Sequence, residues 1–462
     1  MPAMNESAIP AERLDGATPH LRRVLTLRDL LIYAVVIVQP IAPLPLFGII
    51  QADSRGHVVL TLLADMVAMT FTAVSYGRMA ALYPSAGSAY TYVGRGLNPH
   101  LGFFAGWAML LCYVMFPLIN VIYVSVTLHR VFPFIPYILA AIFCAAAMTL
   151  LNLRGVRATT RVNWALFAAM SLVIAAFVVL AIRYLVRAAG WRGFFSPEVI
   201  YNPHTFDWHS LSTAAAFGIL TYLGFDGATT LAEDVENPRR NLPLATVFVV
   251  LFTGALGAIL VFLGARVWPD YHVFSNLETA FMDVCRRVGG VSMYRAMAAI
   301  FVVASFGTGL AAQVGAARLL FGMGREGVLP AGYFGRIDTT RNTAPFNIVL
   351  IGIIGFGGAL AFSFEQGTDL LNFGAFLAFM SVNVVTFWHF YVVRQHGRDR
   401  HFLADALAPL LGLVSCLAVW WGLPRSAMIL GTAWIIGGFV IAAMKTRGFK
   451  TRPVSINFEG GS

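Results

Sequence analysis

Two aspartates lie inside stretches that are otherwise apolar enough to cross a membrane. Asp226 stands between glycines in the stretch 217–230, and Asp65 is an isolated acid in the stretch 62–68. A charged side chain at the centre of a bilayer costs about 2.5–3.5 kcal/mol on insertion scales, so such groups are usually paired or face a cavity. We therefore expect Asp226 to bind an amine or to take up a proton, and Asp65 to take up and release a proton.

Each of these acids also has a structural alternative. Asp226 can cap the second half of an interrupted helix, because a side-chain oxygen there accepts hydrogen bonds from free N–H groups. Asp65 can lie near the end of its helix and pair with a neighbour such as Arg55.

Three prolines interrupt the first membrane-length apolar stretch, at Pro40, Pro43 and Pro45. Each removes a backbone donor and costs about 3 kcal/mol or more in a helix interior, so one continuous helix is excluded. Inside a bilayer, irregular backbone is tolerated only where it is buried in protein or lines a wet cavity. Its free amides favour a carboxylate and its carbonyls favour a cation. The expected binding residues of this interruption are Gln39, Ile41, Ala42 and Pro43.

A second interruption is expected around Gly224 and Gly227, because glycine weakens a helix. Tyr222 and Phe225 stand beside these glycines, and Tyr113 lies in the third apolar stretch. Such rings can stack on an apolar ligand or hold an ammonium group by cation–π contact. Aromatic residues at helical spacing also simply pack, and that alternative stays open.

The whole composition is that of a polytopic membrane protein. The chain has 462 residues, of which 58% are hydrophobic and 12% charged, with a mean hydropathy of +0.74. A soluble domain is roughly 25% charged, and a spanning helix needs about 20 apolar residues. We predict an all-α fold with 12 transmembrane helices, at 27–50, 57–79, 100–128, 134–152, 161–184, 210–232, 243–266, 292–321, 344–363, 369–392, 403–422 and 426–444.

The distribution of charge predicts the orientation. The net charge is +10, but with the N-terminus inside, most Lys and Arg residues fall in inner loops, as the positive-inside rule requires. We therefore expect both termini in the cytoplasm, contact with membrane lipid and no nucleic-acid partner. Residues 1–26 contain no signal peptide pattern. The four cysteines are scattered, without metal or disulfide spacing.

The positions of the two interruptions predict an internal repeat. They lie in the first and sixth spans, and broken helices at corresponding positions are typical of inverted-repeat transporters with a midplane site. We expect one transmembrane domain over 27–445, with repeats at 27–184 and 210–392 and two added helices at 403–444. Cytoplasmic tails are expected at 1–26 and 446–462.

Three ordered motifs are similar to those of the amino acid–polyamine–organocation permeases. They are the inner loop 83–92 (YPSAGSAYTY), the segments 224–227 (GFDG) and 233–243 (EDVENPRRNLP), and the run 317–330 (ARLLFGMGREGVLP). The likeness covers about residues 25–445. It is nearest to the putrescine-importer-like branch, which shares Gln39-Pro40, Phe47-Gly48 and the FDG of span six.

This resemblance implies a LeuT-type fold, with a 5+5 inverted repeat and broken helices 1 and 6. It implies a substrate site between spans 1, 3, 6, 8 and 10, and rocking of spans 1, 2, 6 and 7. The diamine importers carry acids where this chain has Pro45 and Cys112, so Cys112 is expected to face the substrate. Hydroxyls at Ser305 and Thr308 correspond to ion ligands in sodium-coupled members of the fold.

These patterns predict a secondary transporter that imports an amino acid or small organic amine across the cytoplasmic membrane. Protons are the favoured coupling ion and Na⁺ stays open; no other cofactor and no metal are expected. An amine/amino acid antiporter is the first alternative. A channel would need a repeated filter, and an enzyme would need converging catalytic groups, neither of which the sequence contains. We expect the oligomeric state to be a monomer or a homodimer.

Overall fold

The computed structural model describes residues 25–84, 88–154, 160–191, 194–232, 235–325, 329–338, 341, 343–393, 401–446 and 448. Apart from residues 25, 26, 446 and 448, the expected tails at 1–26 and 446–462 lie outside this part of the chain. Nothing in the described residues therefore tests the cytoplasmic tails.

The described residues are helical, with two isolated β-bridges between loop residues. The first half of the chain forms α1 (Leu27–Val38), α2 (Pro43–Asp53), α3 (Val58–Leu82), α4 (Ser88–Gly96), α5 (Pro99–Val131), α6 (Tyr137–Leu153), α7 (Thr160–Ala189), η1 (Pro197–Val199), α8 (Trp208–Gly218), η2 (Ile219–Tyr222) and η3 (Phe225–Leu231). The second half forms α9 (Pro238–Val267), η4 (Leu277–Thr279), α10 (Ala280–Arg325), α11 (Ala331–Phe334), α12 (Pro345–Ala361), α13 (Phe364–Phe387), η5 (Trp388–Val393), η6 (Leu403–Leu407), α14 (Ala408–Trp421) and α15 (Arg425–Lys445).

Every predicted span coincides with helical structure, but not every span is one long helix. Within the described residues, eight helices are long and apolar enough to cross a membrane, or nine if the bent pair α1 and α2 is one span. The fourth and ninth predicted spans are the shorter helices α6 and α12. The sixth is divided into α8, η2 and η3. The count of twelve spans therefore stays a prediction.

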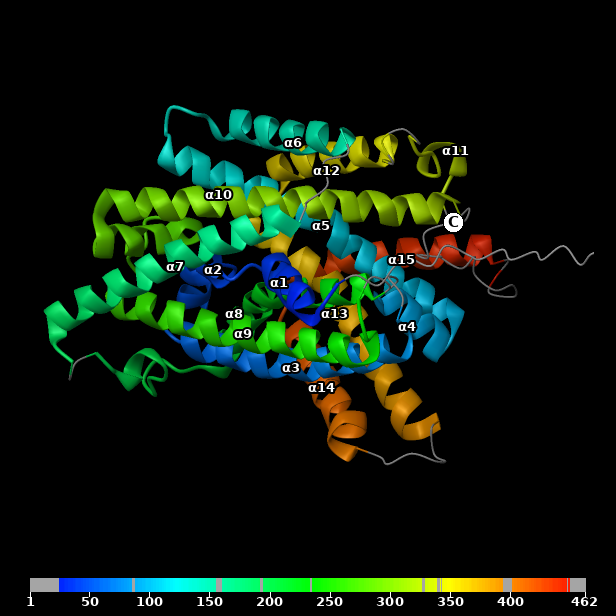
Figure 1. The fold of residues 1–462 in the computed structure, drawn as a ribbon, viewed down its shortest axis with the longest axis horizontal. Coiled ribbons are helices and arrows are strands. Elements are labelled where there is room, and N and C mark those ends of the chain that lie inside the picture. The colour runs from blue at the N-terminus through cyan, green and yellow to red at the C-terminus, as the bar shows by residue number, and fades with distance from the viewer. Residues whose placement is uncertain are drawn as a thin grey trace, which may run out of the picture.

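The long helices lie roughly alongside one another, and α5 runs through the middle of the molecule (Figure 1). It packs against α4, α6, α10, α12, α13 and α15. Most of its side chains are buried, including Asn120 and Tyr123. A helix enclosed on all sides is apolar around its whole circumference, which explains why α5 has no polar stripe.

Helices that are five predicted spans apart pack against each other. The pairs are α1 with η3, α2 with α8, α3 with α9, α5 with α10, and α6 with α12. Spans one and six, two and seven, three and eight, and four and nine are therefore neighbours in space. This arrangement brings the two interruptions together in the interior.

Candidate functional site

The first interruption is a sharp turn between α1 and α2. The two helices are bent by 48°, and Gln39 adopts a positive φ of 64° at the end of α1. Pro43 and Pro45 lie in the first turn of α2, where the N–H groups have no partner within the helix and proline is tolerated. The prolines thus end one helix and begin the next.

The side chain of Gln39 fastens this turn to α10. Its Nε2 donates to the carbonyl oxygen of Ala304, 3.1 Å away, and to the hydroxyl oxygen of Thr308. An amide can use both N–H groups in this way. Gln39, a predicted substrate-binding residue, and Thr308, a predicted ion-coupling residue, therefore bind each other in this structure.

The backbone of the turn uses one of its two predicted amides. The N–H of Ala42 donates to Gln39 O at 3.0 Å, and Leu44 donates to Ile41 O at 3.0 Å. The N–H of Ile41 makes no hydrogen bond with another described residue, and its side chain is buried. Of the two predicted amides, that of Ile41 therefore has no partner among the described residues, whereas that of Ala42 is used within the turn.

The second interruption begins earlier than the sequence predicts. The α-helix ends at Gly218, the 3₁₀ turns η2 and η3 follow, and Leu223 between them is extended. A β-carbon on Gly218 would lie 2.4 Å from Oδ2 of Asp65, and the Tyr222 hydroxyl donates to Leu62 O at 2.7 Å. The early end of α8 thus lies in contact with α3. The sequence of residues 217–230 alone does not predict this contact.

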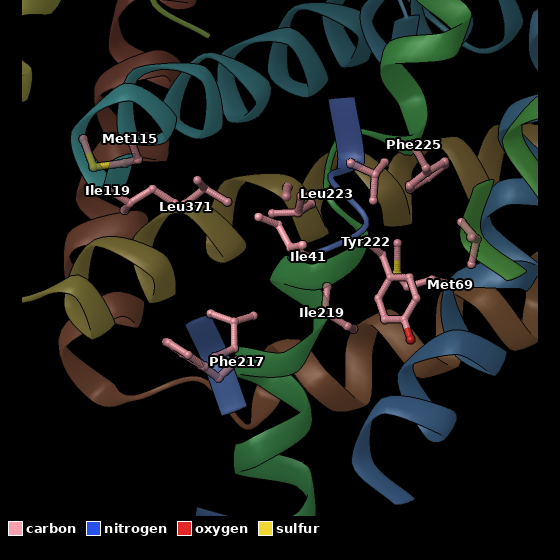
Figure 2. Packing of buried hydrophobic residues seen from close by; sticks show 14 of the residues in the cluster. Ile41, Met69, Met115, Ile119, Phe217, Ile219, Tyr222, Leu223, Phe225 and Leu371 are labelled. Carbon is pink, nitrogen blue, oxygen red and sulfur yellow. The ribbon is translucent and has the colours of Figure 1, made fainter. Parts of the chain in front are cut away.

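The two interruptions pack directly against each other through Ile37. Gly224 has a φ of 102°, which favours glycine, and a β-carbon there would lie 2.8 Å from Cγ2 of Ile37. At Gly227 the nearest atom would be Cδ1 of Ile37 at 3.2 Å. Figure 2 shows the side chains of the second interruption with Ile41 of the first, as parts of one buried cluster.

A cavity of about 70 Å³ lies beside the two interruptions. Spans one, three, six, eight and ten each contribute to its wall, which is the set that the resemblance implied. The polar residues that line it are Gln39, Asn120, Tyr123, Ser305 and Thr308. Its apolar wall includes Ile37, Val38, Ala42, Pro45, Leu46, Phe116, Ile119, Leu220, Leu223 and Phe364.

Only part of the predicted site lines this cavity. Gln39, Ala42, Ser305 and Thr308 do. Sequence reasoning missed Asn120 and Tyr123, which lie on the apolar helix α5 and carry no local signal. The other predicted residues, Ile41, Pro43, Asp65, Cys112, Tyr113, Tyr222, Phe225 and Asp226, are not among the lining residues.

Asp226 instead lies in a second polar group, at the start of η3. Asp226 is 6% exposed and lies in the first turn of η3. The capping role that the sequence left open for it stays a prediction. Cys112 and Tyr113 lie within electrostatic range of the same carboxylate, so the structure brings three predicted residues together here.

Phe225 points into a cluster of aromatic rings. Its ring lies 5.2 Å from that of Tyr76 and 5.3 Å from that of Phe379, measured between centroids. Tyr76 also lies within electrostatic range of Asp226. The Tyr76 contact is edge-to-face and the Phe379 contact is tilted; aromatic pairs add about 0.5–1.5 kcal/mol each beyond burial. In this structure, Phe225 therefore packs against other aromatic rings, which is the alternative that the sequence left open.

Asp65 is a buried acid with an unpartnered oxygen. It is 1% exposed, and its Oδ2 has no hydrogen-bond partner among the described residues. Arg55 does not pair with it, because Arg55 is exposed and lies within range of Asp207. The Asp65 carboxyl faces Gly218 and Tyr222 of the second interruption. Asp65 therefore lies between α3 and the C-terminal end of α8, where the α-helix of the sixth span stops.

No group of three or more His, Cys, Asp or Glu side chains in the described part of the chain is close enough to hold a metal ion. A larger hollow, of about 470 Å³, lies among the loops near Arg55, His204 and Tyr271. It contains no residue of either interruption. The small cavity between spans is therefore the candidate site.

The helices and the cavity define a multi-pass membrane protein of the transporter class. Residues 46–456 match the model of the family described as amino acid permease. The chain therefore belongs to the amino acid permease family, whose members transport rather than transform their substrates.

Two relatives match nearly the whole chain. The low-affinity putrescine importer PlaP of Escherichia coli (strain K12) is 28% identical over 437 residues, which cover 93% of this chain and 95% of that protein. The branched-chain amino acid permease BcaP of Lactococcus lactis subsp. cremoris (strain MG1363) is 26% identical, with coverage of 92% and 95%. Transport of amino acids or amines is therefore the activity that the relatives share.

A solved structure has the same fold. The manganese transporter of Eremococcus coleocola aligns with a TM-score of 0.56, covering 90% of this chain and 92% of that one. At 11% identity, this likeness concerns the fold alone. It agrees with the LeuT-type fold that the sequence predicts.

Proposed function

We propose that this permease imports an amino acid or small organic amine across the cytoplasmic membrane by alternating access. The observation that supports this most directly is the meeting of two interrupted spans at a buried cavity. In a bilayer, such irregular backbone is stable only against protein or water, and it supplies ligands at mid-depth. With the N-terminus inside, α2 ends and α13 begins at the outer face.

The contacts between helices suggest which parts move. The helices α1, α3, α8 and α9 contact one another directly or through η3, so they form a natural rigid body. The Gln39 side chain joins this body to α10 by two hydrogen bonds. Rocking of spans 1, 2, 6 and 7 against the remainder would break these bonds and open the cavity. The contacts between helices that are five spans apart support the proposal that the two halves of the chain form an inverted repeat.

The proposed substrate contacts are polar side chains that line the cavity, those of Asn120, Tyr123 and Ser305. The amide of Asn120 donates to Phe116 O at 2.8 Å, which leaves its carbonyl oxygen as an acceptor for an ammonium group. Asp226 is assigned the capping role, with Cys112 and Tyr113 as its neighbours.

We further propose that coupling is to protons. A sodium ion at Ser305 and Thr308 would need their oxygen atoms and nearby carbonyls as ligands. The amide group of Gln39 already donates to Thr308 and to the Ala304 carbonyl, so a hydrogen-bond donor stands where a cation would bind. Asp65, with an unpartnered oxygen beside the second interruption, is the proposed proton acceptor.

The test is uptake by purified protein in liposomes, with labelled leucine and putrescine as probes. We expect saturable uptake that an inside-alkaline pH gradient drives and that survives replacement of Na⁺ by K⁺. In Asp65→Asn, accumulation should fall to the level reached without a gradient, while the thermal stability of the protein stays unchanged. Asp270→Asn, at an exposed loop residue, is the matched control and should behave as wild type.

Each other result contradicts a definite part of the proposal. Linear flux without saturation would favour a channel. A requirement for Na⁺ would exclude proton coupling. Gradient-driven accumulation that persists in Asp65→Asn would exclude Asp65 as the acceptor.

A further inference from the structure

Arg78, in the last part of α3, forms an ion pair with Asp405 in η6. The side chain of Asp405 is 5% exposed, and that of Arg78 is 27% exposed. The second carboxylate oxygen of Asp405 accepts a hydrogen bond from the N–H of His401 at 3.0 Å, which holds the carboxylate at the start of the eleventh predicted span. The guanidinium group is therefore bound to an element 327 residues further along the chain.

The two partners of Arg78 belong to two different π-helices. Asp405 lies in η6, and the Phe390 ring, whose centroid is 4.3 Å from Cζ of Arg78, lies in η5. These elements contact each other, and they are the π-helical elements of the described residues. Turns of this kind are rare and occur frequently at functional sites. The chain thus departs from the α-helix at both segments that meet this arginine.

Polar contacts continue from the ion pair toward the middle of α3. The Thr72 hydroxyl oxygen accepts from Nδ2 of Asn383 at 3.1 Å and lies 3.5 Å from Sγ of Cys416. The hydroxyl of Thr386 donates to Ser75 O at 3.3 Å. Since Asn383 and Thr386 lie on α13 and Cys416 lies on α14, the second span is fastened to both the tenth and the eleventh.

The ion pair crosses the boundary between the two parts that are proposed to rock against each other. The helix α3 belongs to the body formed by α1, α3, α8 and α9, whereas η5 and η6 belong to the tenth and eleventh spans. The pair must therefore open whenever these parts separate at this end. A buried charge that loses its partner is costly, but Arg78 is partly exposed and can turn toward water. The contact can thus be broken and formed again.

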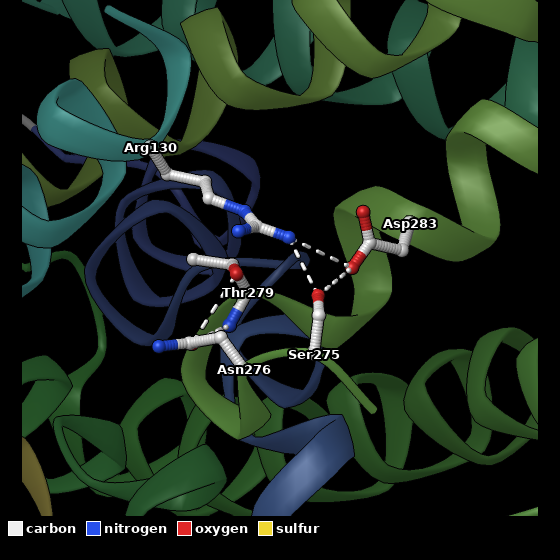
Figure 3. Close-up of polar contacts among 5 residues, drawn as sticks. All are labelled: Arg130, Ser275, Asn276, Thr279 and Asp283. Atoms are coloured by element: carbon white, nitrogen blue, oxygen red, sulfur yellow. Dashed lines mark hydrogen bonds and ion pairs between the residues drawn. The ribbon is translucent and has the colours of Figure 1, made fainter. Parts of the chain in front are cut away.

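A second arginine–aspartate pair provides a contrast. Figure 3 shows Arg130 directed at Ser275 and Asp283. Nη2 of Arg130 donates to Ser275 Oγ at 2.6 Å and lies 3.5 Å from Asp283 Oδ2. Arg130 is in the last turn of α5 and Asp283 is in the first turn of α10. Both helices belong to the remainder, so this pair holds one part together, whereas the Arg78 pair joins the two parts.

We propose that Arg78 and Asp405 form a latch at the inner end of the molecule, which is closed in this structure and opens when the second span moves away from the tenth and eleventh. The ring of Phe390 stabilises the closed latch by cation–π contact. The inner position rests on the proposed orientation, and the opening during transport rests on the proposed import function. Loss of the latch should favour the conformation in which α3 and α14 are apart.

The native residue Cys416 can report the state of the latch, because it lies against α3 and is 1% exposed. Detergent-purified protein is treated with N-ethylmaleimide, and mass spectrometry of the peptides gives the modification rate of each cysteine. We expect a rate at Cys416 that is about tenfold higher in Asp405→Asn than in the wild type, as for the loss of one charge-assisted interaction. Cys144 and Cys285 are also buried but lie on α6 and α10, and their rates should not change. An equal rise at all three cysteines would mean general unfolding and overturns the latch.

Three further variants sharpen the test. Asp283→Asn is the matched control, because it removes a carboxylate from the other arginine–aspartate pair, and it should leave the rate at Cys416 unchanged. Asp405→Glu keeps the charge and should restore slow modification. Phe390→Leu keeps both charges and should raise the rate about threefold, so it decides the matter if Asp405→Asn does not fold. An unchanged rate in folded Asp405→Asn, or an equal rise in Asp283→Asn, overturns the latch.

Uptake by the same proteins in liposomes separates this inference from the proposed function. During uptake of leucine or putrescine, Cys416 of the wild type should be modified faster than without substrate, because the latch opens in each cycle. Uptake that leaves Cys416 fully protected keeps the import function and shows a permanent fastening instead of a latch. Selective exposure of Cys416 in Asp405→Asn, without uptake of either probe by the wild type, supports the latch and removes the import function.

Discussion

The interruption between α1 and α2 turns the chain within residues 39–42, whereas the one in the sixth span extends from Ile219 to Gly224 and continues into a 3₁₀ helix. Proline chemistry produces the first. The second depends on contacts with Ile37, Asp65 and Leu62 on neighbouring helices. A break made by proline persists in any conformation, but a break made by neighbours changes when those neighbours move.

The two interruptions also differ in how they are fastened. The first is joined to α10 by hydrogen bonds from one side chain, Gln39. The second is held to α1 and α3 by close packing at Gly224 and by the Tyr222 hydroxyl. Hydrogen bonds can exchange for water during a transition at little net cost, whereas packed surfaces usually move together. Under the proposed rocking motion, the Gln39 contact is therefore the one expected to break.

The largest effect is expected from Gly224→Ala. A side chain at a φ of 102° is strained, and its β-carbon would overlap Ile37 at 2.8 Å. Left-handed strain of about 1–2 kcal/mol and overpacking of about 1–3 kcal/mol both destabilise the fold. We expect a clear fall in the thermal unfolding temperature and loss of uptake.

Gly227→Ala is the matched control for this prediction. Its β-carbon would meet Ile37 at 3.2 Å, and Gly227 has no positive φ. Its loss of stability should be much smaller than that of Gly224→Ala. Equal losses would mean that the left-handed backbone at Gly224 is not what shapes the second interruption.

An intermediate effect is expected from Gln39→Leu. The change removes both bonds to α10 and leaves a buried carbonyl and hydroxyl with fewer partners, which costs about 1–3 kcal/mol. The conformation in which α1 contacts α10 should lose stability relative to the open one. Cross-linking or cysteine accessibility across the cavity would report this shift.

A double-mutant cycle with Thr308→Val isolates the Gln39–Thr308 contact. We expect a coupling free energy of about 0.5–1.5 kcal/mol in thermal unfolding. Additive effects would show that the two side chains do not stabilise each other, and the first interruption would then be held by its prolines alone.

The smallest effect is expected from Tyr222→Phe. It removes one buried hydrogen bond to Leu62 O, worth about 1 kcal/mol, and leaves the ring in place. Tyr201→Phe, at a half-exposed ring, should be neutral in the same unfolding measurement. A neutral Tyr222→Phe would mean that packing alone joins the second interruption to α3.

The sequence predicts the first interruption well because proline acts on its own backbone. It also predicts that span six is broken, but not that the helix stops at Gly218, because that end is in contact with Asp65 from another helix. Asp226 was expected to bind an amine or take up a proton, and it lies outside the residues that line the small cavity. An isolated acid among glycines is compatible both with a position in the cavity and with a position outside it.

The residues that sequence reasoning missed share one property, which is that their neighbours come from elsewhere in the chain. Asn120 and Tyr123 reach the cavity only because α5 packs against α10 and α13. Such groups form through tertiary packing, which periodicity does not encode.

The Gln39 contact also has a consequence for biogenesis. Its partner Ala304 lies 265 residues further along the chain. At about 5–20 residues per second of synthesis, the ribosome needs on the order of 13–50 s to make that stretch. Throughout this time the Gln39 side chain has no access to its final acceptors, so its amide must be shielded from lipid by the insertion machinery or by water. Slowing translation between α2 and α10 should therefore lower the yield of folded protein more than slowing it after α10.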